Sequence, residues 1–152
     1  MKNITLIILV LFLYNCGYSS IYKNQKVQNF KVNIVEIKGD REMNNLIKNE
    51  LKLYSNKNST KVYELKIDTD YNKEILTKDS SGEITDYTLS ITSTFVINSR
   101  EKSQIIKLSE NIDIKKQSDS FEQSIYEKNI KRNFASSIRE RLILKILNLD
   151  DS

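Results

Sequence analysis

The chain has 152 residues, with 24 Lys or Arg and 20 Asp or Glu, so its formal net charge of +4 permits an anionic partner without requiring one. This length fits a single domain, and the absence of His together with a single Cys excludes His-based catalytic triads, His/Cys zinc sites and intrachain disulfides. Three Gly and no Pro exclude a Gly-rich phosphate loop, which needs several glycines close together.

The N-terminus is typical of a secretory signal peptide. Lys2 precedes an apolar run from Ile4 to Tyr14, which is too short to span a bilayer, because a spanning helix needs about 20 apolar residues. Cys16 follows this run directly. The arrangement resembles the bacterial lipoprotein signal, in which the thiol receives a diacylglyceryl group and cleavage makes the cysteine the first residue. An ordinary buried thiol is the alternative.

The lipoprotein resemblance divides the chain into three parts. It implies a signal peptide over residues 1–15, a lipidation site at Cys16 within a lipidated tether over 16–30, and a single domain over 31–149. The residue after Cys16 is Gly17 and not Asp. In the lipoproteins that the chain resembles, this difference implies export to the outer membrane, with the domain on the periplasmic side. The acyl chains, palmitate among them, would anchor the chain strongly, because each buried methylene contributes about 0.8 kcal/mol.

The domain is predicted to begin with a strand and a helix. The β-branched run over 31–38 indicates a strand, which Gly39 and Asp40 end. Asp40 is a plausible N-cap for a helix over about 41–55. Apolar residues then recur at helical spacing and predict one buried face: Met43, Leu46, Ile47, Leu51 and Tyr54.

A long hairpin is predicted next. Residues alternate between apolar and polar over 62–77, and again over about 84–98, so each segment indicates a strand with one wet face. Ser80-Ser81-Gly82 between them fits a three-residue loop with Gly82 in the left-handed conformation. If Asp79 pairs with Glu83, four apolar pairs face each other: Ile75 with Tyr87, Tyr71 with Ile91, Ile67 with Phe95, and Leu65 with Ile97.

A fourth strand over about 104–115 and a second helix complete the domain. Gln117-Ser118-Asp119-Ser120 can cap this helix, which runs to about Leu147. The strand places Ile106, Leu108, Ile112 and Ile114 on its apolar side. The helix stripe consists of Ile130, Phe134, Ile138, Leu142, Ile146 and Leu149. Phe121 and Ile125 lie off this stripe, so we expect the helix to be bent or to begin late.

The element order β-α-β-β-β-α predicts an α+β fold. One apolar sheet face and two amphipathic helices imply a two-layer sandwich, with two helices packed on a four-stranded, mostly antiparallel sheet. The other sheet face is rich in Thr and charged residues, and we expect it to face water or a polar cavity.

Several short segments, in order along the chain, resemble the LPS-assembly lipoprotein family LptE, particularly its alphaproteobacterial branch. The N-terminal part contributes Cys16-Gly17-Tyr18, Tyr22 and Gly39-Asp40-Arg41. The rest of the likeness comes from Leu46-Ile47-Lys48-Asn49-Glu50-Leu51, Tyr63-Glu64-Leu65 and Asn133-Phe134-Ala135-Ser136-Ser137-Ile138-Arg139-Glu140-Arg141-Leu142. The resemblance covers nearly the whole chain.

The resemblance implies a plug inside the outer-membrane barrel LptD that binds lipopolysaccharide and aids its insertion into the outer leaflet. Phosphates of lipid A would be held by Lys or Arg through charge-assisted hydrogen bonds. The candidate phosphate-binding residues are Lys128, Lys131, Arg132, Arg139 and Arg41. A solvated helix surface explains these residues equally well.

Three other functions are weaker alternatives. The first alternative is a periplasmic accessory lipoprotein of an ABC-type lipid transporter or a secretion machine. We expect no enzyme activity and no cofactor or metal, since the Ser, Lys, Asp and Glu residues show no spacing that distinguishes a catalytic site from a surface. Nucleic-acid binding is not expected either, because an exported chain with no dense basic cluster has neither access nor a suitable surface.

Overall fold

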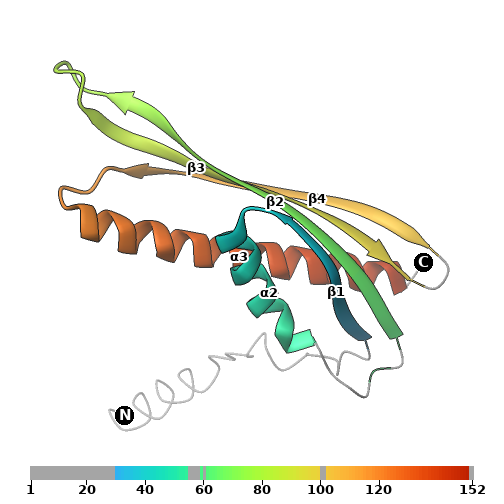
Figure 1. Ribbon diagram of the computed structural model, residues 1–152. Coiled ribbons are helices and arrows are strands. Elements are labelled where there is room, and N and C mark those ends of the chain that lie inside the picture. The colour runs from blue at the N-terminus through green and yellow to red at the C-terminus, as the bar shows by residue number, and fades with distance from the viewer. Residues whose placement is uncertain (1–29, 55–58, 60, 100–101, 151–152) are drawn as a thin grey trace, which may run out of the picture.

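The computed structural model describes residues 30–54, 59, 61–99 and 102–150, so the signal peptide, Cys16 and the tether up to residue 29 lie outside the described residues (Figure 1). The elements follow in the predicted order. They are β1 (Phe30–Gly39), α2 (Arg41–Leu51), the 3-10 turn η2 (Lys52–Tyr54), β2 (Lys61–Lys78), β3 (Ile84–Asn98), β4 (Ser103–Lys115) and α3 (Ser120–Asp150).

The predicted two-layer α+β architecture is confirmed. The four strands form one sheet in the order β1-β2-β3-β4, with β1 parallel to β2 and the other neighbours antiparallel. Helices α2 and α3 lie on the same side of this sheet (Figure 1). The opposite, polar side is not covered by any described element.

The register of the β2–β3 hairpin is the one that the sequence predicts. Ile75 pairs with Tyr87, Tyr71 with Ile91, Ile67 with Phe95, and Leu65 with Ile97. At the loop, the Asp79 amide donates a hydrogen bond to the Glu83 carbonyl at 2.9 Å, and Gly82 has φ +86°. A register shift around Thr77, close to the tip, was not predicted.

The junction between β1 and α2 is built from Gly39 and Asp40. Gly39 has φ +84°, and a Cβ at this position would lie 2.0 Å from the carbonyl oxygen of Thr69. The same oxygen accepts a hydrogen bond from the Asp40 amide at 2.6 Å. The Asp40 carboxylate in turn accepts a bond from the Met43 amide at 2.8 Å, as an N-cap does. The predicted cap is therefore confirmed, and it fixes the direction in which α2 leaves the sheet.

The core fills the space between the sheet and the two helices. Fully buried side chains come from both layers: Met43, Ile47, Leu51, Leu65, Ile67, Leu89, Ile91, Phe95, Ile97, Ile138, Leu142 and Ile146. A buried polar pair, the hydroxyls of Thr69 and Ser93 at 3.0 Å, lies within the same sheet face. Because each hydroxyl has the other as its partner, the pair avoids the cost of an unsatisfied buried group.

The structure corrects one prediction for the second helix and shows one side chain of β4 to be more exposed than its neighbours. Helix α3 begins at Ser120, and Asp119 accepts hydrogen bonds from the amides of Phe121 and Glu122. The prediction that this helix begins late is therefore wrong. Ile112 lies on the same face as its partner Leu89, as predicted, but its side chain is 41% exposed, whereas Leu89 is fully buried. The other apolar residues of this face of β4, Ile106, Leu108 and Ile114, are buried as predicted.

The buried side of α3 rotates along the helix. Its members Ile130, Phe134, Ile138, Leu142 and Ile146 are each four residues apart and all buried, and each such step turns the stripe by about 40°. The same four-residue spacing, continued toward the N-terminus from Ile130, does not include Phe121 or Ile125, and both of these side chains are exposed. The two residues thus lie off the stripe, as predicted, without any delay in the start of the helix.

Candidate functional site

The five predicted phosphate-binding cations all lie in the helical layer. Arg41 begins α2, and Lys128, Lys131, Arg132 and Arg139 lie along α3. Their surroundings divide them into two sets, one paired between the helices and one facing solvent.

Lys131 and Arg139 form ion pairs with α2. The Lys131 ammonium lies 2.5 Å from Glu42 Oε2, and the Arg139 Nε lies 3.3 Å from Glu50 Oε2. The partners are eight positions apart on both helices, so the two pairs together fix how far α2 is displaced along α3. The Lys131 ammonium also lies 4.5 Å from the centre of the Tyr71 ring, a cation–π contact. Both cations therefore join the two helices, and Lys131 also joins them to the sheet.

Lys128, Arg132 and Arg41 are exposed. Within the described part of the chain none of them forms an ion pair, and Arg132 makes only a long hydrogen bond of 3.5 Å to Asn129. They are the members of the predicted set whose charges are not already compensated. The structure thus brings Lys131 and Arg139 together with acidic partners, and leaves the other three without an acidic partner among the described residues.

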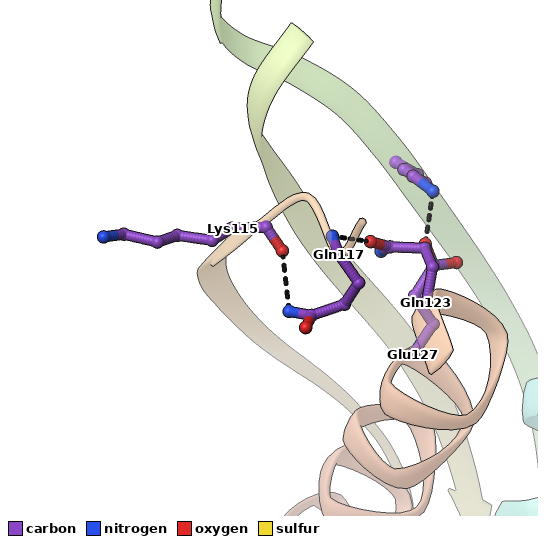
Figure 2. A network of polar contacts seen from close by, with 5 residues as sticks. Lys115, Gln117, Gln123 and Glu127 are labelled. Carbon is purple, nitrogen blue, oxygen red and sulfur yellow. Dashed lines mark hydrogen bonds and ion pairs between the residues drawn. The ribbon is translucent and has the colours of Figure 1, made fainter. Parts of the chain in front are cut away.

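A polar network missed by the sequence analysis joins the hairpin to the start of α3. Lys73 on β2 forms an ion pair with Glu127 on α3, and Gln123 donates a hydrogen bond to the same carboxylate oxygen at 2.6 Å (Figure 2). Gln123 accepts a bond from the Gln117 amide at 2.7 Å, and Gln117 reaches back to the Lys115 carbonyl at 3.2 Å. No local signal predicts this network, because Lys73 and Glu127 are 54 positions apart.

Two side chains in this region have shifted proton affinities. Burial alone would raise the pKa of the Glu127 carboxyl, but hydrogen bonds from Lys73 and Gln123 and attraction to Lys73 and Lys131 hold that pKa below its usual range. Burial raises the pKa of Tyr71 to about 12, and the negative charge of Glu127 acts in the same direction. The region is therefore set to keep Glu127 charged and Tyr71 neutral.

Because of the Lys73–Glu127 pair, we expect the stability of the fold to depend on pH. A carboxyl whose pKa is lower in the folded chain stabilises the fold above its ordinary pKa of 4.5, and this stabilisation is lost as the pH falls through the folded value. In a Lys73→Met chain burial remains while the pair is gone, so we expect the pKa of Glu127 to move upward. NMR titration of the Glu127 carboxyl carbon measures the shift.

The matched control is Lys66→Met. This change removes a cation that pairs with the more exposed Glu36, on the other side of the sheet, and it should leave the pKa of Glu127 unchanged. An unchanged Glu127 titration in Lys73→Met would show that the pair does not lower the pKa.

The polar face of the sheet forms a second candidate surface. Threonine and serine hydroxyls follow β3 and bond across to β4, as Thr88 does to Asp113 at 2.6 Å and Thr92 to Ser109 at 3.0 Å. A shallow hollow of about 290 Å³ lies over these strands, lined by Ser90, Ile91, Thr92, Ser109, Glu110 and Asn111. Its hydroxyl and amide groups suit contact with a polar surface.

The described residues contain no cluster of acidic or sulfur side chains suited to hold a metal ion. Among the same residues, neither helix combines the length and the apolar character that crossing a bilayer requires.

Comparisons with known proteins identify the fold. No protein-family model and no curated protein sequence matches the chain. Its structure is similar to that of rare lipoprotein B from Shewanella oneidensis, with a TM-score of 0.57 and 17% identity over 78% of this chain and 99% of that one. A putative lipoprotein from Caulobacter crescentus is similar with a TM-score of 0.51 and 7% identity, over 80% of this chain and 89% of that one. The chain therefore has a fold that solved bacterial lipoproteins share.

Proposed function

We propose that the chain is an outer-membrane lipoprotein of the LptE type, which partners and plugs an LptD-type barrel, binds lipopolysaccharide and aids its insertion into the outer leaflet. The observation that carries the proposal is the combination of this fold with the position of Cys16. The fold is shared with rare lipoprotein B over nearly all of that protein, and Cys16 follows an apolar run of signal-peptide length.

The polar sheet face supports a barrel partner. Lumens of outer-membrane barrels are lined by polar side chains, so a plug needs a polar exterior. The face that carries Thr88, Thr92 and Ser109 is extended, hydroxyl-rich and uncovered by the helices. We therefore assign this face to the barrel contact.

The uncompensated cations support lipopolysaccharide binding. A phosphate that approaches Lys131 or Arg139 has to compete with Glu42 or Glu50 for the cation. Lys128, Arg132 and Arg41 carry no such competitor among the described residues, so first contact with a lipid A phosphate falls to them. Lys131 and Arg139 join only if the phosphate displaces their helical partners.

Copurification from solubilised membranes tests the barrel partnership. A tagged chain should bring down an outer-membrane barrel of the LptD type from detergent extracts. Recovery of an inner-membrane ATPase complex instead would support the alternative, an accessory lipoprotein of an ABC-type lipid transporter or a secretion machine. The matched control is an unrelated tagged lipoprotein extracted in the same way, which should recover neither.

A further inference from the structure

The first turns of α3 carry an exposed stripe that the core and the ion pairs leave unused. It consists of Phe121, Ile125, Lys128 and Arg132, which we call the outer stripe. At about 100° per residue the four side chains fall within an arc of roughly 60°. The buried Ile130 lies on the opposite side of the helix from this arc. The outer stripe therefore points away from the sheet.

The stripe joins apolar and cationic groups without an acidic one. Phe121 is 70% exposed and Ile125 is 46% exposed, and Lys128 and Arg132 follow on the same line. The neighbouring acids lie outside this arc, Glu122 about 60° from Ile125 and Glu127 about 100° from Lys128, and Glu127 is already paired with Lys73. Where a helix lies in a membrane interface, large apolar side chains enter the headgroup boundary and Lys and Arg contact anionic lipids.

Charge complementarity and chain length select the surface that the stripe meets. An anionic leaflet attracts Lys and Arg close to it, and apolar side chains enter the boundary between headgroups and acyl chains. From Cys16 to Phe30 the chain advances 14 positions, which span at most about 50 Å. With 31 residues, α3 is about 46 Å long. The extended tether is therefore about as long as α3. For this reason a chain anchored at Cys16 can place the outer stripe on the same membrane.

We propose that the outer stripe lies on an anionic phospholipid surface while no barrel holds the domain. Phe121 and Ile125 enter the headgroup boundary, and Lys128 and Arg132 contact lipid phosphates. The inference rests on the lipid anchor of the proposed function, and it does not require the barrel or lipopolysaccharide. The polar sheet face then points away from the bilayer, where a partner can approach it.

Tryptophan fluorescence tests the contact directly, because the sequence contains no Trp. The full chain carrying Phe121→Trp is reconstituted in phosphatidylcholine vesicles with or without about 30% phosphatidylglycerol. With brominated lipid present, the anionic vesicles should quench most of the emission and shift the remainder to shorter wavelength. The neutral vesicles should quench it less, and salt of about 0.5 M should weaken the quenching in the anionic ones.

The matched control is Ile105→Trp. Ile105 is 69% exposed, nearly equal to Phe121, but it lies on the polar side of the sheet. Its indole should stay unquenched in both kinds of vesicle. Charge reversal by Lys128→Glu with Arg132→Glu should abolish the quenching at position 121, whereas the same reversal at exposed Lys102 and Lys107 should preserve it.

The outcomes separate this inference from the proposed function. If the chain binds vesicles but the indole at position 121 stays as unquenched as the one at position 105, the outer stripe does not contact the membrane. The proposed lipid anchor is not contradicted by this result. Added lipopolysaccharide that shifts the emission at position 121 to shorter wavelength, where anionic brominated phospholipid neither shifts nor quenches it, also contradicts the inference. Quenching at position 121 in a chain that never recovers a barrel supports the outer stripe and counts against the barrel partnership.

Discussion

Gly39→Ala is expected to lower the free energy of unfolding by about 3 kcal/mol or more, since it adds a backbone clash to an unfavourable φ. The added methyl group would lie 2.0 Å from the carbonyl oxygen of Thr69, a backbone atom that cannot move aside alone. That oxygen also accepts the hydrogen bond of Asp40, whose side chain caps α2. The substitution should therefore also disturb the junction of Gly39 and Asp40, which sets the direction of α2. Urea unfolding followed by circular dichroism measures the loss.

Gly82→Ala is the matched control for this substitution. Gly82 has nearly the same φ, +86°, but nothing lies within 4 Å of an added Cβ. Only the left-handed backbone conformation is then penalised, by about 1 kcal/mol. Equal losses in the two variants would show that the contact between Gly39 and Thr69 is not a packing constraint.

Cys16→Ser is expected to move the chain from the membrane fraction to the soluble periplasmic fraction. The thiol is the predicted acylation site, and the anchoring energy resides in the acyl chains, because each buried methylene contributes about 0.8 kcal/mol. Serine is nearly isosteric with cysteine, so a fold in which residue 16 packed as an ordinary thiol would be little disturbed. Fractionation followed by immunoblotting measures the distribution.

Gly17→Asp is the control for Cys16→Ser. It preserves the thiol, and in lipoproteins an Asp at this position opposes export to the outer membrane, so the chain should stay membrane-bound but in the inner membrane. A membrane fraction that Cys16→Ser leaves unchanged would contradict lipid anchoring through this residue.

The hairpin was predictable because two independent signals agree on it. The alternation along β2 and β3 sets which side chains face the core, and the loop ending at Gly82 sets the register. Asp40 was predictable as a cap because its partner, the Met43 amide, is only three positions away. Local chemistry was sufficient in both cases.

The contacts between distant segments could not be predicted in the same way. Strand β1 pairs with β2 in parallel, and its register shifts between Ile34 and Glu36, where no turn links the two strands to specify it. The pairing of Lys131 with Glu42 depends on how α2 docks on α3, 89 positions along the chain. For this reason the sequence alone grouped Lys131 with Lys128, although one is paired and the other exposed.

Mass spectrometry of the N-terminal peptide, isolated from the membrane fraction of cells that make the native chain, tests lipid anchoring most directly. The account predicts a first residue Cys16 that carries a diacylglyceryl group, with residues 1–15 absent. A soluble cytosolic chain that retains residues 1–15 with an unmodified Cys16 would contradict it.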